Sequence, residues 1–290
     1  MFDIVVKNGT VIDGTGAEPM RTDVAIAGDR VVAVGQVPGE AARTIDATGL
    51  VVSPGFIDLH AHSDMSFLVD PLADSKLRQG VTLELVGNCG MSFCAPLNDK
   101  TLGSFRSWAK RSSPDLKPTW TNFAGYLGAL EQAGSVINVA TQVGHNQIRS
   151  FVMGDVARAP STDELLEMER NVVEALDAGA MGLSTGLYFA PGSYSLTDEV
   201  ISLTRPVAER DKLYSSHMRS ESDESPGLFT AIQESIEIGR RTGARIEISH
   251  VKAHGPRVWG RAAAILESIT EARREGVDVA GDQYPYAACS

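Results

Sequence analysis

Residues 161–186 read STDELLEMERNVVEALDAGAMGLSTG, a helix signal followed directly by a strand signal. Ser161 and Glu164 form a capping-box pattern, which satisfies N–H groups at the start of a helix. Apolar residues then recur at helical spacing as far as Leu176, and Gly179 can end the helix. The apolar run that follows is typical of a buried strand. The stretch therefore predicts a helix over residues 161–179 and a β-strand near residues 180–184.

The same alternation continues on both sides of this stretch. Two further helices are predicted over residues 226–242 and 258–275. Candidate strands lie near residues 56–60, 81–87, 137–143, 180–184, 213–217, 245–250 and 277–281. Alternating strands and helices imply a parallel sheet with helical crossovers, and a closed barrel of this kind has eight strands in about 250 residues. Since seven candidates are present, we expect an incomplete α/β barrel over residues 56–290, and hence a part of a longer gene product.

Residues 1–55 carry a different pattern, in which short β signals alternate with turn residues. Asn8-Gly9 and Asp13-Gly14 read as turns, and Gly28-Asp29 lies between two apolar runs, as in a hairpin. We predict a small β domain over residues 1–55, built as an antiparallel sheet or as part of a sandwich.

Composition excludes several kinds of partner. The formal net charge of −11 argues against binding of nucleic acid, because phosphates would be repelled. No apolar stretch approaches the roughly 20 residues that span a bilayer, so no membrane partner is expected. Three cysteines in 290 residues do not form a disulfide framework, and the first residues lack the basic start of a signal peptide. We therefore expect a reduced, cytoplasmic protein.

The segment FIDLHAH at residues 56–62 is the strongest local signal for chemistry. Side chains two apart on a strand share a face, so Asp58, His60 and His62 are expected to point together into the barrel. Two neutral imidazoles at one strand end suit zinc. A histidine pair that merely caps the strand is the alternative.

Two later candidate strands also end in histidine, His217 and His250, at the rim where barrel enzymes carry their sites. One histidine there is usually a packed side chain, whereas four at matching depths indicate a metal centre. Cys89, in the segment GNCG, is either a buried free thiol or a thiolate ligand, and spacing leaves both open. Cys94 and Cys289 are interpreted as structural. We expect His145 in a loop or at the rim.

Two cations share strand parity with these histidines. Lys252 follows His250 by two residues, and Arg219 follows His217 by two. If its strand continued, each cation would project towards the same end of the barrel as the histidine before it. A substrate carboxylate would explain such cations, and a solvated side chain is the alternative.

Several segments together resemble the D-aminoacylase group of the amidohydrolase superfamily, which includes N-acyl-D-glutamate and N-acyl-D-aspartate deacylases. They occur in the family's order from one end of the chain to the other. The segments are KNGTVIDGTG, PGFIDLHAHSD, GNCG, GLSTGLYFAPG, SHMRSE, ISHVKAHG and DQYPY.

This resemblance implies a metal-dependent (β/α)8 barrel with one or two zinc ions and a small β sandwich built from both ends of the gene product. His60 and His62 match ligands on the first strand. Cys89 matches a cysteine ligand that can bridge two metals, and His217 and His250 match ligands of the second site.

The resemblance also implies contacts to a small-molecule substrate. Lys252 matches a residue that helps to bind the substrate carboxylate, and Tyr284 matches another substrate-contacting position. Tyr188 lies in a segment that lines the pocket, and Arg219 stays a spatial candidate. The family's catalytic aspartate ends the eighth strand. Because Asp278 and Asp282 belong to the seventh-strand region, no catalytic residue is identified within the chain.

The implied activity is zinc-dependent hydrolysis of N-acyl-D-amino acids to a carboxylate and a free D-amino acid. A cyclic-amide hydrolase resembling hydantoinase or dihydroorotase is the first alternative. Those enzymes bridge their metals with a lysine of the fourth strand, whereas residues 179–189 contain no lysine and Cys89 is present. The second alternative is an inert metal-binding fragment that lacks the eighth-strand aspartate.

Overall fold

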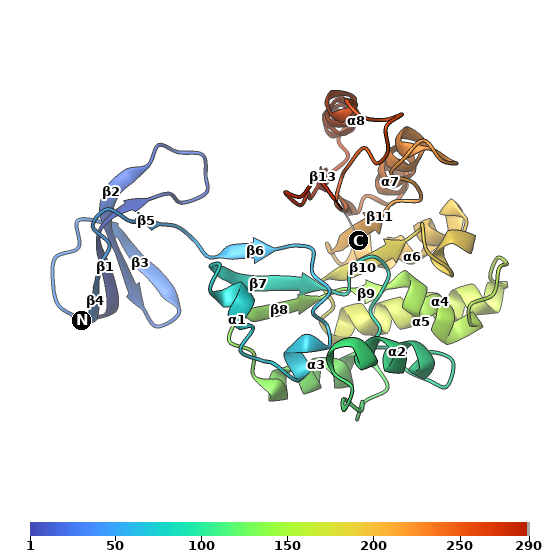
Figure 1. Cartoon of the computed structure of the whole chain (residues 1–290), viewed down its shortest axis with the longest axis horizontal. Helices are drawn as coiled ribbons and strands as arrows, with labels where there is room; N and C mark the ends of the chain where they lie inside the picture. The colour runs from blue at the N-terminus through green and yellow to red at the C-terminus, as the bar shows by residue number, and fades with distance from the viewer. Residues whose placement is uncertain (289–290) are drawn as a thin grey trace. The chain divides into compact units, whose positions relative to one another are not determined.

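The computed structural model describes residues 1–288, and Cys289 lies outside them. The chain forms two compact units, Met1–Phe56 and Ile57–Ser290, which are described separately. The α/β class expected from the alternation of strands and helices is confirmed (Figure 1).

The first unit is a single five-stranded sheet around a small core of Val5, Ala25 and Val37. The hairpin predicted at Gly28-Asp29 is present, with β2 antiparallel to β3. The strands are β1 (Phe2–Val11), β2 (Met20–Ala27), β3 (Arg30–Gly35), β4 (Ala41–Asp46) and β5 (Val51–Val52).

Two details of this unit differ from the prediction. Asn8-Gly9 is not a turn between two strands but an irregularity inside the continuous strand β1. Asn8 adopts a left-handed conformation (φ 63°), and its N–H donates to Asp23 Oδ1 at 3.0 Å, which absorbs the extra residue as a bulge does. The sheet is also mixed rather than antiparallel, because β4 and β5 both run parallel to β1.

The strands of the second unit follow one another in space in their sequence order. They form a sheet of three and a sheet of five, and only Gln142 separates the last strand of the first from the edge strand of the second. The strands are β6 (Phe56–Asp58), β7 (Val81–Val86), β8 (Asn138–Thr141), β9 (Val143–Gly144), β10 (Gly182–Gly186), β11 (Leu213–His217), β12 (Arg245–Ile248) and β13 (Val279–Gly281).

Helices alternate with these strands along the chain. The predicted helix at residues 161–179 is α5 (Thr162–Ala178), and its Ser161–Glu164 capping box is formed. The others are α1 (Asp74–Leu77), α2 (Leu102–Ser112), α3 (Phe123–Ala133), α4 (His145–Met153), α6 (Thr197–Glu209), α7 (Leu228–Thr242) and α8 (Ala262–Arg274), with 3-10 turns at Ser66–Leu68 and Gly192–Tyr194. Among residues 1–288, no helix has the length and apolarity needed to cross a membrane.

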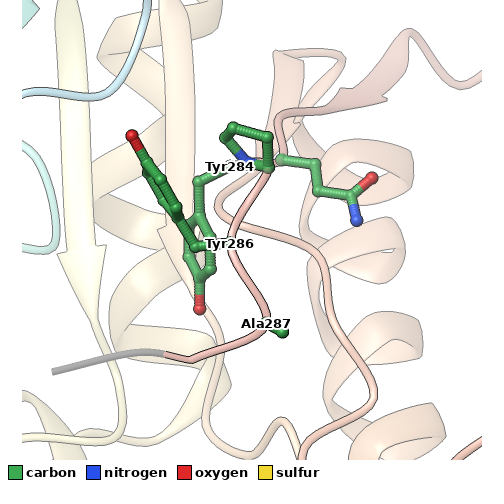
Figure 2. A pocket seen from close by; sticks show the side chains of 5 residues that line it. Tyr284, Tyr286 and Ala287 are labelled. Atoms are coloured by element: carbon green, nitrogen blue, oxygen red, sulfur yellow. The ribbon is translucent and has the colours of Figure 1, made fainter.

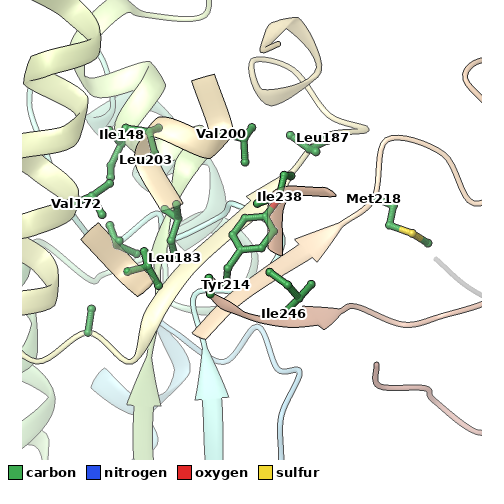
Figure 3. Packing of buried hydrophobic residues seen from close by; sticks show 14 of the residues in the cluster. Ile148, Val172, Leu183, Leu187, Val200, Leu203, Tyr214, Met218, Ile238 and Ile246 are labelled. Carbon is green, nitrogen blue, oxygen red and sulfur yellow. The ribbon is translucent and has the colours of Figure 1, made fainter. Parts of the chain in front are cut away.

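One row of apolar side chains crosses the five-stranded sheet and faces the helices. Hydrogen-bonded register makes its members direct neighbours on β9 to β13: Val143, Leu183, Tyr214, Ile246 and Val279. All are at most 2% exposed, and they join helix residues such as Ile148, Val200 and Ile238 in one core (Figure 3).

The next row alternates to the opposite face and is small or polar: Gly144, Ser184, Ser215, Glu247 and Ala280. Two residues further along β10 and β11, this face ends at Gly186 and His217. The sheet therefore presents polar groups, and finally a histidine, at the carboxyl ends of its strands.

Candidate metal centre

Five predicted ligands converge at the carboxyl ends of strands from both sheets of the second unit. Ligand atoms of His60, His62 and Cys89 lie within 4.8 Å of one another, and so do those of Cys89, His217 and His250. Cys89 belongs to both groups. Two adjacent three-residue sets that share one sulfur are thus formed from four different strand ends.

His60 and His62 follow β6 rather than lying on it. The strand ends at Asp58, whose Oδ1 accepts the His60 N–H at 3.1 Å. Its Oδ2 accepts a bond from Lys76 Nζ at 2.7 Å. The expectation that Asp58 points with the two histidines is therefore wrong, because the local turn and the lysine claim its carboxylate. The two imidazole rings nevertheless lie together, with centroids 5.4 Å apart.

Cys89 is placed by a tight turn after β7. Gly87, Cys89 and Gly90 all have positive φ, with Cys89 at 55°, and a non-glycine residue in this conformation is uncommon. Gly186 lies so close that a Cβ there would be 2.2 Å from the Cys89 carbonyl oxygen. The turn thus holds the sulfur by backbone packing.

The Asn88 side chain connects this turn to the histidine segment. Its Nδ2 lies within hydrogen-bond distance of the carbonyls of Leu59, Ala61 and Leu85, at 3.4, 3.3 and 2.8 Å. Gln142 Nε2 donates to Asn88 Oδ1 at 2.9 Å, and Ser215 donates to Gln142 Oε1 at 2.9 Å. This buried chain of hydrogen bonds links the ends of β6, β7 and β8 to the middle of β11.

His250 reaches the cluster because its backbone breaks the alternation of β12. Ile246 and Ile248 face the helices, so strict alternation would send residue 250 the same way. His250 instead has φ 39°, and its ring centroid lies 4.4 Å from that of His217 and 4.8 Å from that of His60.

Each of the two histidines beside the sulfur is backed by a carboxylate. Nε2 of His60 lies 3.2 Å from Cys89 Sγ, and its Nδ1 lies 3.1 Å from Asp282 Oδ2. Nε2 of His250 lies 3.6 Å from the same sulfur, and its Nδ1 lies 2.7 Å from Glu221 Oε1. This arrangement matches metal-binding histidines, whose second nitrogen usually contacts a carboxylate or carbonyl.

The charges around the sulfur are unevenly distributed. Burial acts to raise the pKa of Asp282, but hydrogen bonding with His60 and Glu247 outweighs it and brings the pKa to about 2. Burial likewise opposes ionisation of Glu221, and hydrogen bonds from His250 and Lys252 lower its pKa to about 2. Burial and the charge of Asp282 raise the pKa of Glu247 above its ordinary value.

The donor set fits a borderline-soft cation such as zinc. Burial lowers the pKa of His217 to about 3, with His250 acting in the same direction, so its imidazole is neutral as a ligand must be. Its Nδ1 is buried and has no hydrogen-bond partner among the described residues. Burial raises the pKa of the Cys89 thiol, so a nearby cation is needed to form the thiolate.

The predicted substrate-binding residues lie in different settings. Lys252 Nζ is 2.5 Å from Glu221 Oε1 and 5.3 Å from the centroid of the Tyr284 ring, so these two candidates adjoin the cluster. The Tyr188 ring is exposed and lies 6.1 Å from that of His217. Arg219 is directed away, with its guanidinium paired to Glu234 at 2.9 and 3.0 Å.

The segment after β13 forms an open pocket of about 410 Å³, lined by Gln283, Tyr284, Pro285, Tyr286 and Ala287. Figure 2 shows the rings of Tyr284 and Tyr286 on the same side of this segment. Tyr286 is 76% exposed, whereas Tyr284 carries the contact with Lys252.

Sequence reasoning gave no role at the cluster to the acids Glu221, Glu247 and Asp282, and it misplaced His145. Glu221 and Asp282 lie in the quoted segments SHMRSE and DQYPY, so their motifs were visible but their contacts were not. His145 is not at the rim: it is fully buried, and its Nε2 lies 2.9 Å from Glu199 Oε1.

Comparison with known proteins gives a consistent result. The family model of the amidohydrolase family matches residues 43–218. The N-acyl-D-glutamate deacylase of Alcaligenes xylosoxydans xylosoxydans is 42% identical over 291 residues, covering 100% of this chain and 58% of that protein. The D-aminoacylase of the same organism is 37% identical over 300 residues, with the same two coverages. The chain therefore spans 58% of the length of these curated relatives.

A solved structure extends the similarity to three dimensions. The N-acyl-D-glutamate deacylase of Bordetella bronchiseptica, crystallised with zinc and a phosphonate mimic of the tetrahedral intermediate, is 39% identical with a TM-score of 0.89. The match covers 98% of this chain and 59% of that one. Since the family model also matches more than half of the sequence, the chain belongs to the amidohydrolase family and, within it, to the D-aminoacylase group.

Proposed function

We propose that this chain supplies the metal centre of a zinc-dependent hydrolase that cleaves the amide bond of N-acyl-D-amino acids. The observation that carries the proposal is the pair of ligand sets sharing the Cys89 sulfur. Thiolate and neutral imidazole together select zinc over the hard cations. The ligands would be His60, His62, Cys89, His217 and His250, for one or two ions. The relatives named for deacylation of D-glutamate and other D-amino acids support the substrate class.

Bound zinc would activate water and polarise the amide carbonyl. The residues of this chain provide the surroundings for that chemistry. The Cys89 turn and the Asn88 amide tie Cys89 to the backbone of the segment that carries His60 and His62, so the geometry of these ligands is set before substrate arrives. The transfer of a proton to the leaving amine belongs to the family's eighth-strand aspartate, and we assign no residue of 1–288 to it.

Lys252 is our candidate for the substrate carboxylate. Its ammonium group lies beside His250 and is 18% exposed on its side chain, so an anion can approach it next to the ligands. Tyr284 packs against the same cation, and Tyr188 would line the mouth. A fixed carboxylate would orient the scissile bond, and its position relative to the metal would select the D configuration. Among the described residues, Arg219 bonds to Glu234 and Ser193 rather than to a ligand histidine, whereas Lys252 lies beside His250.

Two further proposals concern the domain boundary and the cellular location of the protein. We retain a boundary between a β domain (1–55) and a barrel domain (56–290), which the division into two compact units supports. We also retain a cytoplasmic location, supported by the free thiols of Cys89 and Cys94.

The test is zinc-dependent release of acetate from N-acetyl-D-amino acids, by the 290-residue chain and by any longer protein that its gene encodes. We expect the gene product to hydrolyse D but not L substrates and to lose activity on chelation. Turnover of hydantoin instead would identify a cyclic-amide hydrolase. Zinc binding without turnover by either protein would support the inert alternative, and absence of both would refute the metal centre.

A further inference from the structure

Asp282 connects two ligand-bearing segments that are far apart in the sequence. Its Oδ2 lies 3.1 Å from Nδ1 of His60, and its Oδ1 accepts the backbone N–H of His250 at 2.5 Å. The carboxylate is 15% exposed on its side chain, so water competes little for either oxygen. The residue follows β13, at the end of the strand beside that of His250.

The chemistry of these partners determines the tautomer of His60. A neutral imidazole carries one proton, and a carboxylate can only accept a hydrogen bond. Nδ1 of His60 must therefore hold the proton, which leaves the lone pair on Nε2. That nitrogen lies 3.2 Å from Cys89 Sγ, in the ligand cluster.

We propose that Asp282 is a positioning residue of the metal centre, which sets the Nδ1-protonated tautomer of His60 and fixes the backbone of His250. The inference rests on the metal centre proposed above. It assigns Asp282 no contact with substrate. Its effect passes through the two histidines.

The fixed backbone is needed because His250 has φ 39°, a conformation that costs a non-glycine residue energy. The bond from the His250 N–H to Asp282 compensates for part of that cost. Val251 N–H also donates to the Asp282 carbonyl at 2.9 Å, so side chain and backbone of Asp282 both hold this turn.

The neighbouring acids do not have the same role. Glu221 Oε1 faces Nδ1 of His250, but Lys252 Nζ lies 3.0 Å from the same nitrogen, so donor and acceptor compete there. Glu247 accepts from Ser249 Oγ and from the Asp282 N–H. Unlike Glu221, Asp282 faces Nδ1 of its ligand histidine with no competing donor among the described residues.

An amide in place of the carboxylate would reverse the tautomer. The backbone N–H of His250 is an obligatory donor and would take the single amide oxygen of an Asp282→Asn variant. The NH₂ group would then face Nδ1 of His60 and would need a lone pair there. The proton would move to Nε2, the nitrogen directed towards Cys89, and block it as a ligand.

The experiment is a long-range proton–nitrogen NMR spectrum of histidine-labelled protein at pH 8 after removal of metal, which distinguishes the two tautomers. Wild type should show His60 protonated at Nδ1, and Asp282→Asn should show it protonated at Nε2. Zinc affinity, measured by chelator competition, should fall by about 10- to 100-fold in this variant. Circular dichroism checks that each variant is folded.

Two further variants separate the role from a general effect on folding. Asp282→Glu keeps two acceptor oxygens and should keep the Nδ1 tautomer, with most of the zinc affinity. Asp278→Asn is the control on the same segment: the side chain of Asp278 is 63% exposed and pairs with Arg245 rather than with a histidine, so this change should alter neither the tautomer nor the affinity. Should Asp282→Asn keep the wild-type tautomer, or should wild type itself be protonated at Nε2, the inference is overturned. A wild type that binds no zinc would instead overturn the proposed function, while the tautomer still decides this inference.

Discussion

At the scale of single residues, both ligand sets depend on the sulfur atom of Cys89. Its sulfur lies 3.2 Å from Nε2 of His60 and 3.6 Å from Nε2 of His250. Removing it would leave two histidines on either side, and neither pair completes the three protein ligands that zinc sites commonly use.

Cys89→Ala is therefore expected to lower zinc affinity by more than about 100-fold, beyond the usual effect of a supporting residue. Zinc content of purified protein, measured by mass spectrometry after dialysis, checks this. Cys94→Ala is the matched control, since Cys94 is also a buried free thiol but belongs to neither ligand set. Equal loss of zinc in both variants would show a folding defect rather than a lost ligand.

The residue types of this site could be predicted from the sequence, but their geometry could not. Histidines at predicted strand ends indicated a metal centre, whereas Cys89 was assigned as a ligand only through the family resemblance. The left-handed backbone of Cys89 and His250 leaves no signal in residue type, since neither is glycine. The acids Asp282 and Glu221 were visible only as members of motifs, because their partners lie on other strands.

At the scale of elements, the strand ends are held by close backbone contacts. A Cβ on Gly186 of β10 would lie 2.2 Å from the carbonyl oxygen of Cys89, which is backbone and cannot rotate away. The end of β10 therefore limits where the Cys89 turn can lie.

Gly186→Ala is expected to displace this turn and to lower zinc affinity about 10-fold or more, while the helices remain folded. Chelator competition and circular dichroism measure the two effects. Gly128→Ala in α3 is the control, because nothing lies within 4 Å of the added methyl group. That change should leave zinc affinity unchanged and stabilise the helix by about 0.5–1 kcal/mol. Unchanged affinity in Gly186→Ala would show that the turn adapts without moving the sulfur.

Helices α4 and α6 are joined by a buried charge cluster. Arg149 Nη1 donates to both carboxylate oxygens of Glu199 at 2.6 Å, and His145 Nε2 lies 2.9 Å from the same group. Burial acts to raise the pKa of Glu199, but His145 and Arg149 outweigh it and hold the pKa below its ordinary value. Stability from this carboxylate is therefore present at neutral pH and is lost as the pH falls below about 4.5.

Glu199→Gln should lower the free energy of unfolding by about 3–5 kcal/mol at pH 7, because it leaves the fully buried Arg149 without its counter-charge. The difference from wild type should begin to shrink only as the pH falls below about 4.5, and should keep shrinking through the lowered pKa of Glu199. Urea unfolding across this pH range measures both. Glu237→Gln removes an exposed ion pair on α7 and should cost less than about 1 kcal/mol. A similar loss in both variants would contradict the role of burial.

Element types were predictable where the sequence carried a local signal. The capping box gave the start of α5, and strands alternating with helices gave the seven barrel positions. The burial of His145 was missed because its partner Glu199 lies on α6 and meets it only after α4 and α6 pack together. The bulge at Asn8 was missed because a turn and a bulge use the same residues.

At the scale of the whole molecule, all five ligands belong to the second unit, Ile57–Ser290. Ligand binding stabilises the structure that forms the site. Zinc should therefore slow hydrogen exchange at the ends of β7, β11 and β12, and a chelator should reverse the effect. Mass spectrometry of peptides measures this, with β1 to β4 as an internal reference. Equal protection of the reference strands would contradict a site built within the second unit.

Anomalous scattering at the zinc edge, from crystals of the zinc-loaded protein, tests the metal centre most directly. We predict one or two peaks within about 2.3 Å of Cys89 Sγ, with His60 and His62 on one side and His217 and His250 on the other. A peak bound elsewhere, or none near this sulfur in zinc-loaded crystals, would contradict it.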